Sequence, residues 1–255
     1  MEVSLNAVWL LAALLAFVRA AAWLVVMPPF QSRTTVPPIA LVGVAGGLAI
    51  LSAPQVMSQG VPTDTGGLVG AVVVQVVLGV ALGFCVQILL STISSAGIMV
   101  DLFGGINPPP AMDPLSQNQI PILGQFYEQM AIVLLFVTNG ELLLVKGFEF
   151  SFSVTTLHLT SSAVMAHVLV SDLATFFVAS LEIAAPIIVV LFAAQVGLAM
   201  LSKAAPQMNA WWLGLPLQIM LSLVLVAVTV RVLPGYLSHL LARAAQDMTT
   251  MIGMH

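Results

Sequence analysis

The longest apolar stretch of this 255-residue chain, Leu68 to Val100, contains no Asp, Glu, Lys or Arg. In a membrane such a stretch forms a helix, because a helix satisfies its backbone hydrogen bonds internally. As one helix it would be about 50 Å long, well beyond the roughly 30 Å hydrocarbon core of a bilayer. This length fits a helix that is partly covered by protein better than an independent membrane span.

The rest of the sequence is nearly as apolar. Hydrophobic residues make up 60% of the chain and charged residues 6%, whereas soluble domains are about 25% charged. The composition predicts an integral membrane protein. The net charge of −4 and the lack of Lys/Arg runs argue against nucleic acid as a partner.

Polar or Pro/Gly stretches divide the chain into six apolar runs, which are 7–27, 39–53, 68–100, 125–148, 173–201 and 209–233. They predict an all-α protein of about six hydrophobic, partly kinked helices arranged as hairpins. The second run is bounded by Pro38 and Pro54. At about 22 Å it is too short to span a bilayer alone. We expect a polar connector at 151–172 and a C-terminal tail at 234–255.

Small residues recur at four-residue spacing within these runs. The rows are Ala12/Ala16/Ala20, Gly43/Gly47, Gly66/Gly70 and Gly79/Gly83. Such rows let helix backbones approach closely, so tight helix packing is expected. The third run also carries uncharged polar residues, Gln75, Gln87, Ser91, Thr92, Ser94 and Ser95. Helix packing and pore lining are equally consistent with them.

Charged residues are few enough to consider individually. Arg19 and Glu182 lie deepest within apolar runs, and a structural ion pair or a partner on a neighbouring subunit is favoured over a functional site. The others lie near segment ends, where long side chains commonly reach the membrane interface. These are Asp101, Glu128, Glu141, Lys146, Asp172, Lys203 and Arg231.

Signatures of catalysis or cofactor binding are absent from the sequence. It contains no Gly-x-Ser-x-Gly, His-Glu-x-x-His or phosphate-loop motif, and the acids nominate no catalytic pair. The four histidines lack the spacing of metal ligands. The lone cysteine, Cys85, is expected to be a buried thiol that packs as a small hydrophobe. We expect no enzyme, no metal and no cofactor.

The segment Gly104 to Pro121 (GGINPPPAMDPLSQNQIP) interrupts the helices with glycine, proline and amide residues. Irregular backbone beside a membrane is tolerated only inside protein or facing water. Gly104 and Gly105 supply conformational freedom at its start. Asp113 and Pro114 predict a turn fixed by the aspartate side chain.

Several short motifs, read in order, resemble one family. The first are Phe17-Val18-Arg19, Met27-Pro28-Pro29-Phe30, Val36-Pro37 and Leu78-Gly79-Val80-Ala81-Leu82-Gly83-Phe84. Then come Ala96-Gly97, Asp101 with Gly104, Met112-Asp113-Pro114, Pro121-Ile122-Leu123-Gly124, Leu135-Phe136, Asn139-Gly140 and Ser151-Phe152. The last are Ala185-Pro186, Ala205-Pro206-Gln207-Met208-Asn209 and Leu213-Gly214-Leu215-Pro216-Leu217. Their order and spacing resemble the FliR family of flagellar export-gate proteins and its injectisome relatives.

The resemblance implies a channel subunit of the bacterial inner membrane, located at the flagellar basal body. Family members assemble with FliP and FliQ proteins, and FlhB-like and FlhA-like components are further expected partners, with unfolded proteins as cargo. Residues 1–150 would form a FliP-like part that contains the loop 104–121. Residues 173–233 would form a FliQ-like hairpin.

The resemblance also assigns roles to residues. The loop would project into the lumen and help to close it, through Gly104, Gly105, Ile106, Asn107, Pro108, Pro109, Pro110, Met112, Asp113 and Pro114. Helix packing and assembly are expected at Arg19, Gly79, Gly83, Pro186, Pro206, Gln207, Asn209, Gly214 and Pro216. The chain departs from the family where Gln218 stands for a usual lysine, where Glu141 stands for a common histidine, and where Pro38 to Ala40 lack the usual basic residues.

Three other functions stay open from sequence alone. The chain could serve a virulence injectisome instead of a flagellum. It could be a secondary transporter, since broken helices and polar groups within apolar helices are typical of that class. It could also be a structural nucleator that organises the channel without gating it.

Overall fold

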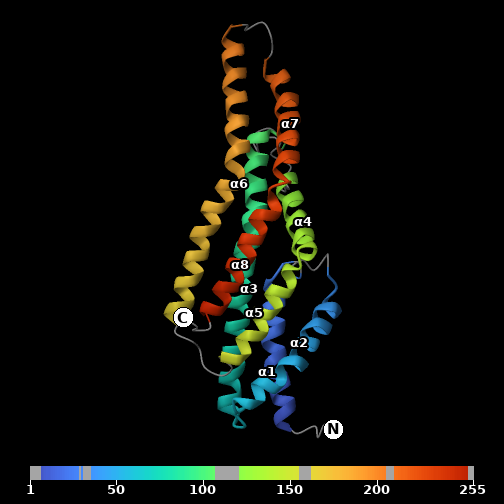
Figure 1. Ribbon diagram of the computed structural model, residues 1–255, viewed down its shortest axis with the longest axis vertical. Helices are drawn as coiled ribbons and strands as arrows, with labels where there is room; N and C mark the ends of the chain where they lie inside the picture. The colour runs from blue at the N-terminus through green and yellow to red at the C-terminus, as the bar shows by residue number, and fades with distance from the viewer. Residues whose placement is uncertain are drawn as a thin grey trace. The chain divides into compact units, whose positions relative to one another are not determined.

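The computed structural model describes residues 7–28, 30, 36–106, 121–154, 162–204 and 210–251 (Figure 1). Every regular element in those ranges is an α-helix, which confirms the all-α class. The helices are α1 (Ala7–Val26), α2 (Pro38–Ser58), α3 (Thr65–Gly104), α4 (Ile122–Val137), α5 (Gly140–Val154), α6 (Ser162–Ala204), α7 (Ala210–Thr229) and α8 (Leu233–Met251).

Four of these helices, α1, α2, α3 and α6, are long and apolar enough to cross a membrane. Two further spans result if each bent pair crosses as one unit. These pairs are α4 with α5, bent by 76°, and α7 with α8, bent by 58°. The sequence predicts about six hydrophobic segments, some of them kinked. The two bent pairs correspond to kinked segments.

The prediction that the second run is too short to span is wrong. Helix α2 continues through Pro54 to Ser58 and has 21 residues, which is about 31 Å of helix. Pro54 lies in the last part of the helix, where its missing N–H costs one backbone hydrogen bond and does not end the helix. Pro38 stands at the first helical position, which favours proline.

The fourth apolar run does not form one helix. It breaks after Val137, where the Thr138 N–H donates to the Leu134 carbonyl and Asn139 adopts a left-handed φ of 54°. Asparagine tolerates this conformation better than most residues that carry a side chain. The sequence signal was the turn-forming Asn139-Gly140 pair, which lies within an otherwise apolar stretch.

Two segments expected to be irregular contain helix. Helix α6 begins at Ser162, inside the expected connector 151–172, and the expected tail carries α8. Hydropathy alone does not indicate α8, because this helix is amphipathic and buries only the apolar residues that recur at helical spacing. Its buried residues include Leu237, Leu241, Ala244 and Met248.

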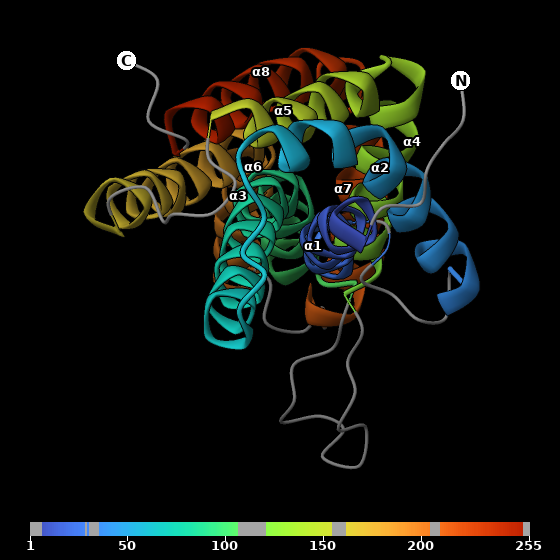
Figure 2. The ribbon, with the colours of Figure 1, turned by 90° about the horizontal axis from the view of Figure 1, so that it is seen from below.

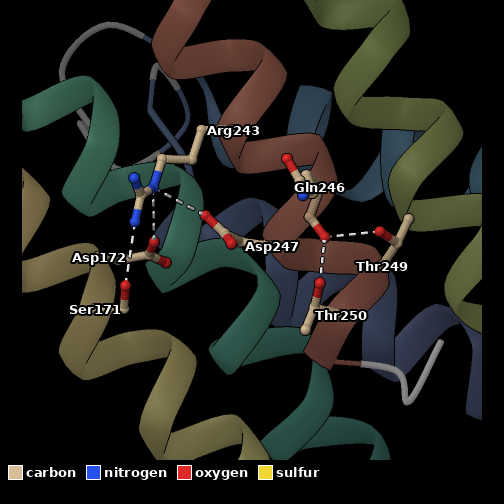
Figure 3. Close-up of polar contacts among 7 residues, drawn as sticks. All are labelled: Ser171, Asp172, Arg243, Gln246, Asp247, Thr249 and Thr250. Atoms are coloured by element: carbon tan, nitrogen blue, oxygen red, sulfur yellow. Dashed lines mark hydrogen bonds and ion pairs between the residues drawn. The ribbon is translucent and has the colours of Figure 1, made fainter. Parts of the chain in front are cut away.

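Polar contacts tie α8 to the start of α6 (Figure 3). The Arg243 Nη2 donates to the Ser171 Oγ at 3.1 Å. The Arg243 Nε lies 3.9 Å from the Asp172 Oδ1 and 3.4 Å from the Asp247 Oδ2. Asp172 is fully buried. The expectation that this acid reaches the membrane interface is therefore wrong, because it faces an arginine of a packed helix.

The chain forms two compact units. One contains the described residues of 1–89, 139–173 and 240–255, and the other those of 90–138 and 174–239. Helices α3, α6 and α8 each contribute to both. In the first unit α1 lies beside α2 in both views (Figures 1 and 2). Cys85 is buried there, as expected.

Glycines of α3 bring its backbone against α1. A Cβ atom at Gly79 would lie 2.5 Å from the Arg19 carbonyl oxygen, and one at Gly83 would lie 2.7 Å from the Trp23 carbonyl oxygen. The α1 side chains that these Cβ atoms would meet are Ala22 and Val26. Elsewhere on α1, Ala12, Ala16 and Ala20 are fully buried. The rows at Gly43/Gly47 and Gly66/Gly70 behave differently. A Cβ at Gly43, Gly47 or Gly70 would meet no atom within 4 Å, so tight packing of those rows within the chain is not found.

Arg19 belongs to the first unit and is fully buried. Its Nε donates to the Gln75 Oε1 at 2.6 Å, and its Nη1 donates to the carbonyl and the Oγ of Ser151 at 2.9 and 3.0 Å. The Phe152 ring lies 4.2 Å from the guanidinium carbon, a distance at which the cation is attracted to the ring face. Arg19 therefore connects α1, α3 and α5 through hydrogen bonds. Of the two roles expected for Gln75, helix packing fits its buried bond to Arg19.

Replacement of Arg19 should destabilise the fold strongly. Arg19→Ala leaves the Gln75 and Ser151 acceptors buried without their donor, and we expect a loss of about 3 kcal/mol. Ser151→Ala removes only one acceptor and keeps its carbonyl, so about 1 kcal/mol should be lost. The melting temperature of the purified protein in mild detergent measures both variants. Equal melting of Arg19→Ala and the wild type would contradict this role.

Candidate functional site

The loop that follows α3 was the main functional prediction, and the structure describes its two ends. Residues 107–120 lie outside the described residues, so the predicted roles of Asn107, Pro108, Pro109, Pro110, Met112, Asp113 and Pro114 lie there too. We use the term loop base for the end of α3 from Gly97 to Gly105, the start of α4, and the side chains of α6 and α7 that contact α3. All of these residues belong to the second unit.

Asp101 joins the end of α3 to the start of α4. Its Oδ2 accepts hydrogen bonds from the backbone N–H groups of Leu123 at 2.8 Å and Gly124 at 3.2 Å. The first N–H groups of a helix have no partner within the helix, and a carboxylate suits the positive end of the helix dipole. Asp101 is 2% exposed. The expectation that it reaches the membrane interface is wrong, because it caps α4.

The backbones of α3 and α4 also touch beside this cap. A Cβ at Gly97 would lie 2.6 Å from the Leu123 carbonyl oxygen, and one at Gly124 would lie 2.6 Å from the Ile98 Cγ1. A larger residue at either position would force the helices apart. Gly97, Asp101 and the Leu123-Gly124 pair came from separate family motifs, and here they form one contact.

The other end of the loop base is held by α6 and α7. The Gln195 Nε2 of α6 donates to the Phe103 carbonyl at 3.1 Å. Gly104 packs against the Ser222 side chain of α7, since a Cβ there would lie 3.1 Å from the Ser222 Cβ. Gly105 follows with a left-handed φ of 67°. This is the usual conformation for a glycine that ends a helix.

Gln218 lies beside Gly105. A Cβ at Gly105 would lie 3.0 Å from the Gln218 Oε1 and 3.7 Å from the Leu215 Cδ2. The same helices line a pocket of about 230 Å³ whose walls include Gln195, Ser202, Gly214, Leu215 and Gln218. A side chain at position 105 would be strained by the left-handed backbone and would have to displace the Gln218 amide.

The expected packing residues are distributed over both units. Arg19, Gly79 and Gly83 lie together in the first unit, and Gly214 is buried against Leu198 in the second. Pro186 and Pro216 lie inside α6 and α7, and both are exposed. Pro206, Gln207 and Asn209 lie outside the described residues.

Sequence reasoning missed the functional placement of Asp101 and Gln195. Gln195 is an amide in an otherwise apolar stretch, and such a residue commonly bonds to a neighbouring helix. That signal could have nominated it. The partners of Asp101 lie 22 and 23 residues along the chain, and no local pattern links them. Glu182, considered alongside Arg19, is exposed on α6.

Loss of the Asp101 cap should loosen the start of α4. Asp101→Ala leaves two buried N–H groups without their carboxylate, and we expect a loss of about 2 kcal/mol. Hydrogen exchange at Leu123 and Gly124 should then accelerate. Asp64 is a matched control, because its Oδ2 accepts from the Gly67 N–H at 2.7 Å in an exposed cap that water can replace. If Asp64→Ala and Asp101→Ala lower the free energy of unfolding equally, the claim that burial strengthens the Asp101 cap is wrong.

Comparison with known proteins gives the chain a family. The sequence profile described as bacterial export proteins, family 1, matches residues 10–244. The chain is 27% identical to "Flagellar biosynthetic protein FliR" of Escherichia coli (strain K12), over 83% of this chain and 82% of that protein. It is 24% identical to the protein of the same name from Bacillus subtilis (strain 168), over 94% of each.

A relative with a different name is also similar. "Secretion system apparatus protein SsaT" of Salmonella typhimurium is 21% identical over 92% of each chain. The profile match covers nearly the whole chain, including every described residue of the loop base. The chain belongs to the bacterial export proteins, family 1.

Proposed function

We propose that this chain is a structural and gating subunit of the type III protein export channel of the bacterial flagellum. The names of the FliR relatives support the flagellar assignment. The similarity to SsaT keeps a virulence secretion system as the second candidate. The subunit acts by position and closure, without catalysis.

The length of the exposed apolar surface supports assembly with other membrane subunits. On α3, the large exposed side chains run from Val69 to Leu102, which are 59% and 78% exposed. This separation is about 50 Å along a helix, against a hydrocarbon core of about 30 Å. On α6, exposed apolar residues run from Val170 to Leu201, a further long separation. Rows longer than the hydrocarbon core support the proposal that partner proteins cover what lipid does not.

The expected partners are FliP-like and FliQ-like subunits in the bacterial inner membrane, with FlhB-like and FlhA-like components beside them. The division of the chain into a FliP-like part at 1–150 and a FliQ-like hairpin at 173–233 stays a prediction. So does the passage of unfolded flagellar proteins as cargo. The apolar rows on α3 and α6 are the surfaces that such partners would cover.

The observation that carries the gating proposal is the anchoring of both ends of the loop. Asp101 holds the start of α4, while Gln195, Gln218 and Ser222 contact the last residues before the loop. Because both ends are held, changes within the segment should leave the helices that carry it folded. Ile106, the three prolines and Met112 give this segment an apolar surface suited to sealing a narrow lumen against ions.

Removal of Ile106 to Met112 should make the resting channel leak. We expect the assembled complex to form normally and, after reconstitution in lipid vesicles, to pass small ions faster than the wild type. Dissipation of a potassium gradient measures this flux. An intact complex with unchanged ion permeability would contradict closure by the loop.

A replacement of equal length separates sealing from assembly. Substituting Gly/Ser for residues 106–112 keeps the chain length and removes the apolar surface, so the leak should persist. The same replacement in the connector 155–161 serves as the control and should leave the vesicles tight. Normal sealing by the 106–112 replacement would favour a nucleator that does not gate.

Purification in mild detergent tests the assembly. We expect two further multi-pass membrane proteins, one FliP-like and one FliQ-like, to copurify with the chain. A purified monomer that carries small solutes across vesicles would instead support the secondary transporter.

A further inference from the structure

The contact between α6 and α8 brings two acids to a single cation (Figure 3). Asp172 of α6 is fully buried, and the Asp247 side chain of α8 is 18% exposed. The Arg243 Nε lies 3.9 Å from the Asp172 Oδ1 and 3.4 Å from the Asp247 Oδ2. All three residues belong to the first unit. If both acids were ionised, the cluster would carry one negative charge that Arg243 does not neutralise.

Asp172 lacks the hydrogen bonds that a buried carboxylate needs. Neither of its oxygens has a hydrogen-bond donor among the residues that the structure describes. The Arg243 Nη2 donates to the Ser171 Oγ instead. The Arg243 Nε lies beyond the roughly 3.2 Å reach of a good hydrogen bond to either acid. A buried charge without such bonds is costly, so the ionised form of Asp172 is poorly stabilised here.

The other groups around Asp172 do not supply the missing donor. In the described part of the chain, the titratable or charged groups that face it are Cys85 of α3 and Arg243 and Asp247 of α8. A thiol is only a weak donor, and an ionised carboxylate can only accept. A proton on one acid changes this, because its carboxyl O–H can donate to the other acid in a strong, charge-assisted bond.

We propose that Asp172 and Asp247 bind one proton between them and that this proton stabilises the contact of α8 with α6. Two carboxylates that share a site hold a proton in this way, since both cannot ionise without repulsion. With the proton bound, the one remaining negative charge lies opposite Arg243 and the cluster is neutral. Loss of the proton leaves two carboxylates around one cation and weakens the contact. This site goes beyond the proposed export function and does not depend on it.

A shared proton gives the stability of the protein a pH dependence of definite sign. Aspartate in the unfolded chain ionises above about pH 4, whereas the folded cluster holds its proton to higher pH. The folded state then binds more protons than the unfolded state, so stability falls as the pH rises. An ordinary ion pair of Arg243 with two ionised acids has the opposite sign, because its contribution is lost as the pH falls.

Melting of the purified protein in mild detergent, at about pH 5 and about pH 8, distinguishes the two signs. We expect the wild type to melt about 3 °C lower at the higher pH. Asp172→Asn replaces the proton by an amide donor, so it should melt like the wild type at the lower pH and lose most of this difference. Asp64→Asn, the same change in an exposed acid, should keep it.

Two results of the melting experiment would overturn the proposal. One is a wild-type melting temperature that stays constant or rises with pH. The other is a folded Asp172→Asn variant with the same pH dependence as the wild type.

Infrared spectroscopy of the wild type detects the proton without relying on a variant. The carbonyl band of a protonated carboxyl group should persist at about pH 6, where ordinary Asp and Glu side chains are ionised. Asp172→Asn and Asp247→Asn should each remove the band. Asp101→Asn should retain it, because Asp101 caps α4 in the second unit. Absence of the band from the wild type, or its persistence in either folded variant of the pair, would show that no proton is shared.

Discussion

The architecture depends on pairing backbone polar groups in apolar surroundings. A helix that ends inside such surroundings leaves N–H groups at one end and carbonyl groups at the other, and water cannot satisfy them there. The chain interrupts its helices at a segment rich in proline and glycine, so it creates two such ends close together. Asp101 bonds to the N–H groups that begin α4, and Gln195 bonds to a carbonyl at the end of α3. These side chains pair backbone groups on both sides of the interruption.

The same principle explains the first unit. Arg19 is buried, and its guanidinium bonds to an amide of α3 and to both oxygens of Ser151 on α5. Charged residues are rare in this chain, and several of those that the structure describes join one helix to another. Arg19 connects three helices and Asp101 connects two, while Arg243 approaches Asp172 across α8 and α6. Close glycine contacts bring the helices together, and the buried polar residues fix their register.

Much of the fold could be predicted from the sequence, because hydropathy and small-residue spacing act locally. The uncharged run Leu68 to Val100 lies within one helix, α3, and Gly79 and Gly83 pack against α1. The wrong predictions arose because the same local residue pattern can either end a helix or lie within one. Pro54 suggested a helix end but lies within α2, and Asn139-Gly140 breaks a run that looks continuous. Amphipathic α8 was missed because charged and polar residues interrupt its apolar ones, so it contains no continuous apolar run.

The site itself was only half predictable. Gly104 and Gly105 marked the start of the loop, since glycine before a proline-rich stretch is a local signal. The partners that hold the loop base lie about 20 to 120 residues away, and single-sequence patterns do not pair such distant residues.

A map of the assembled complex in lipid, in its resting state, tests the central claim most directly. The account predicts that residues 106–121 cross the lumen, with Asp101 still bonded to Leu123 and Gly124. A lumen left open, with this loop on the outer surface of the complex, would contradict it.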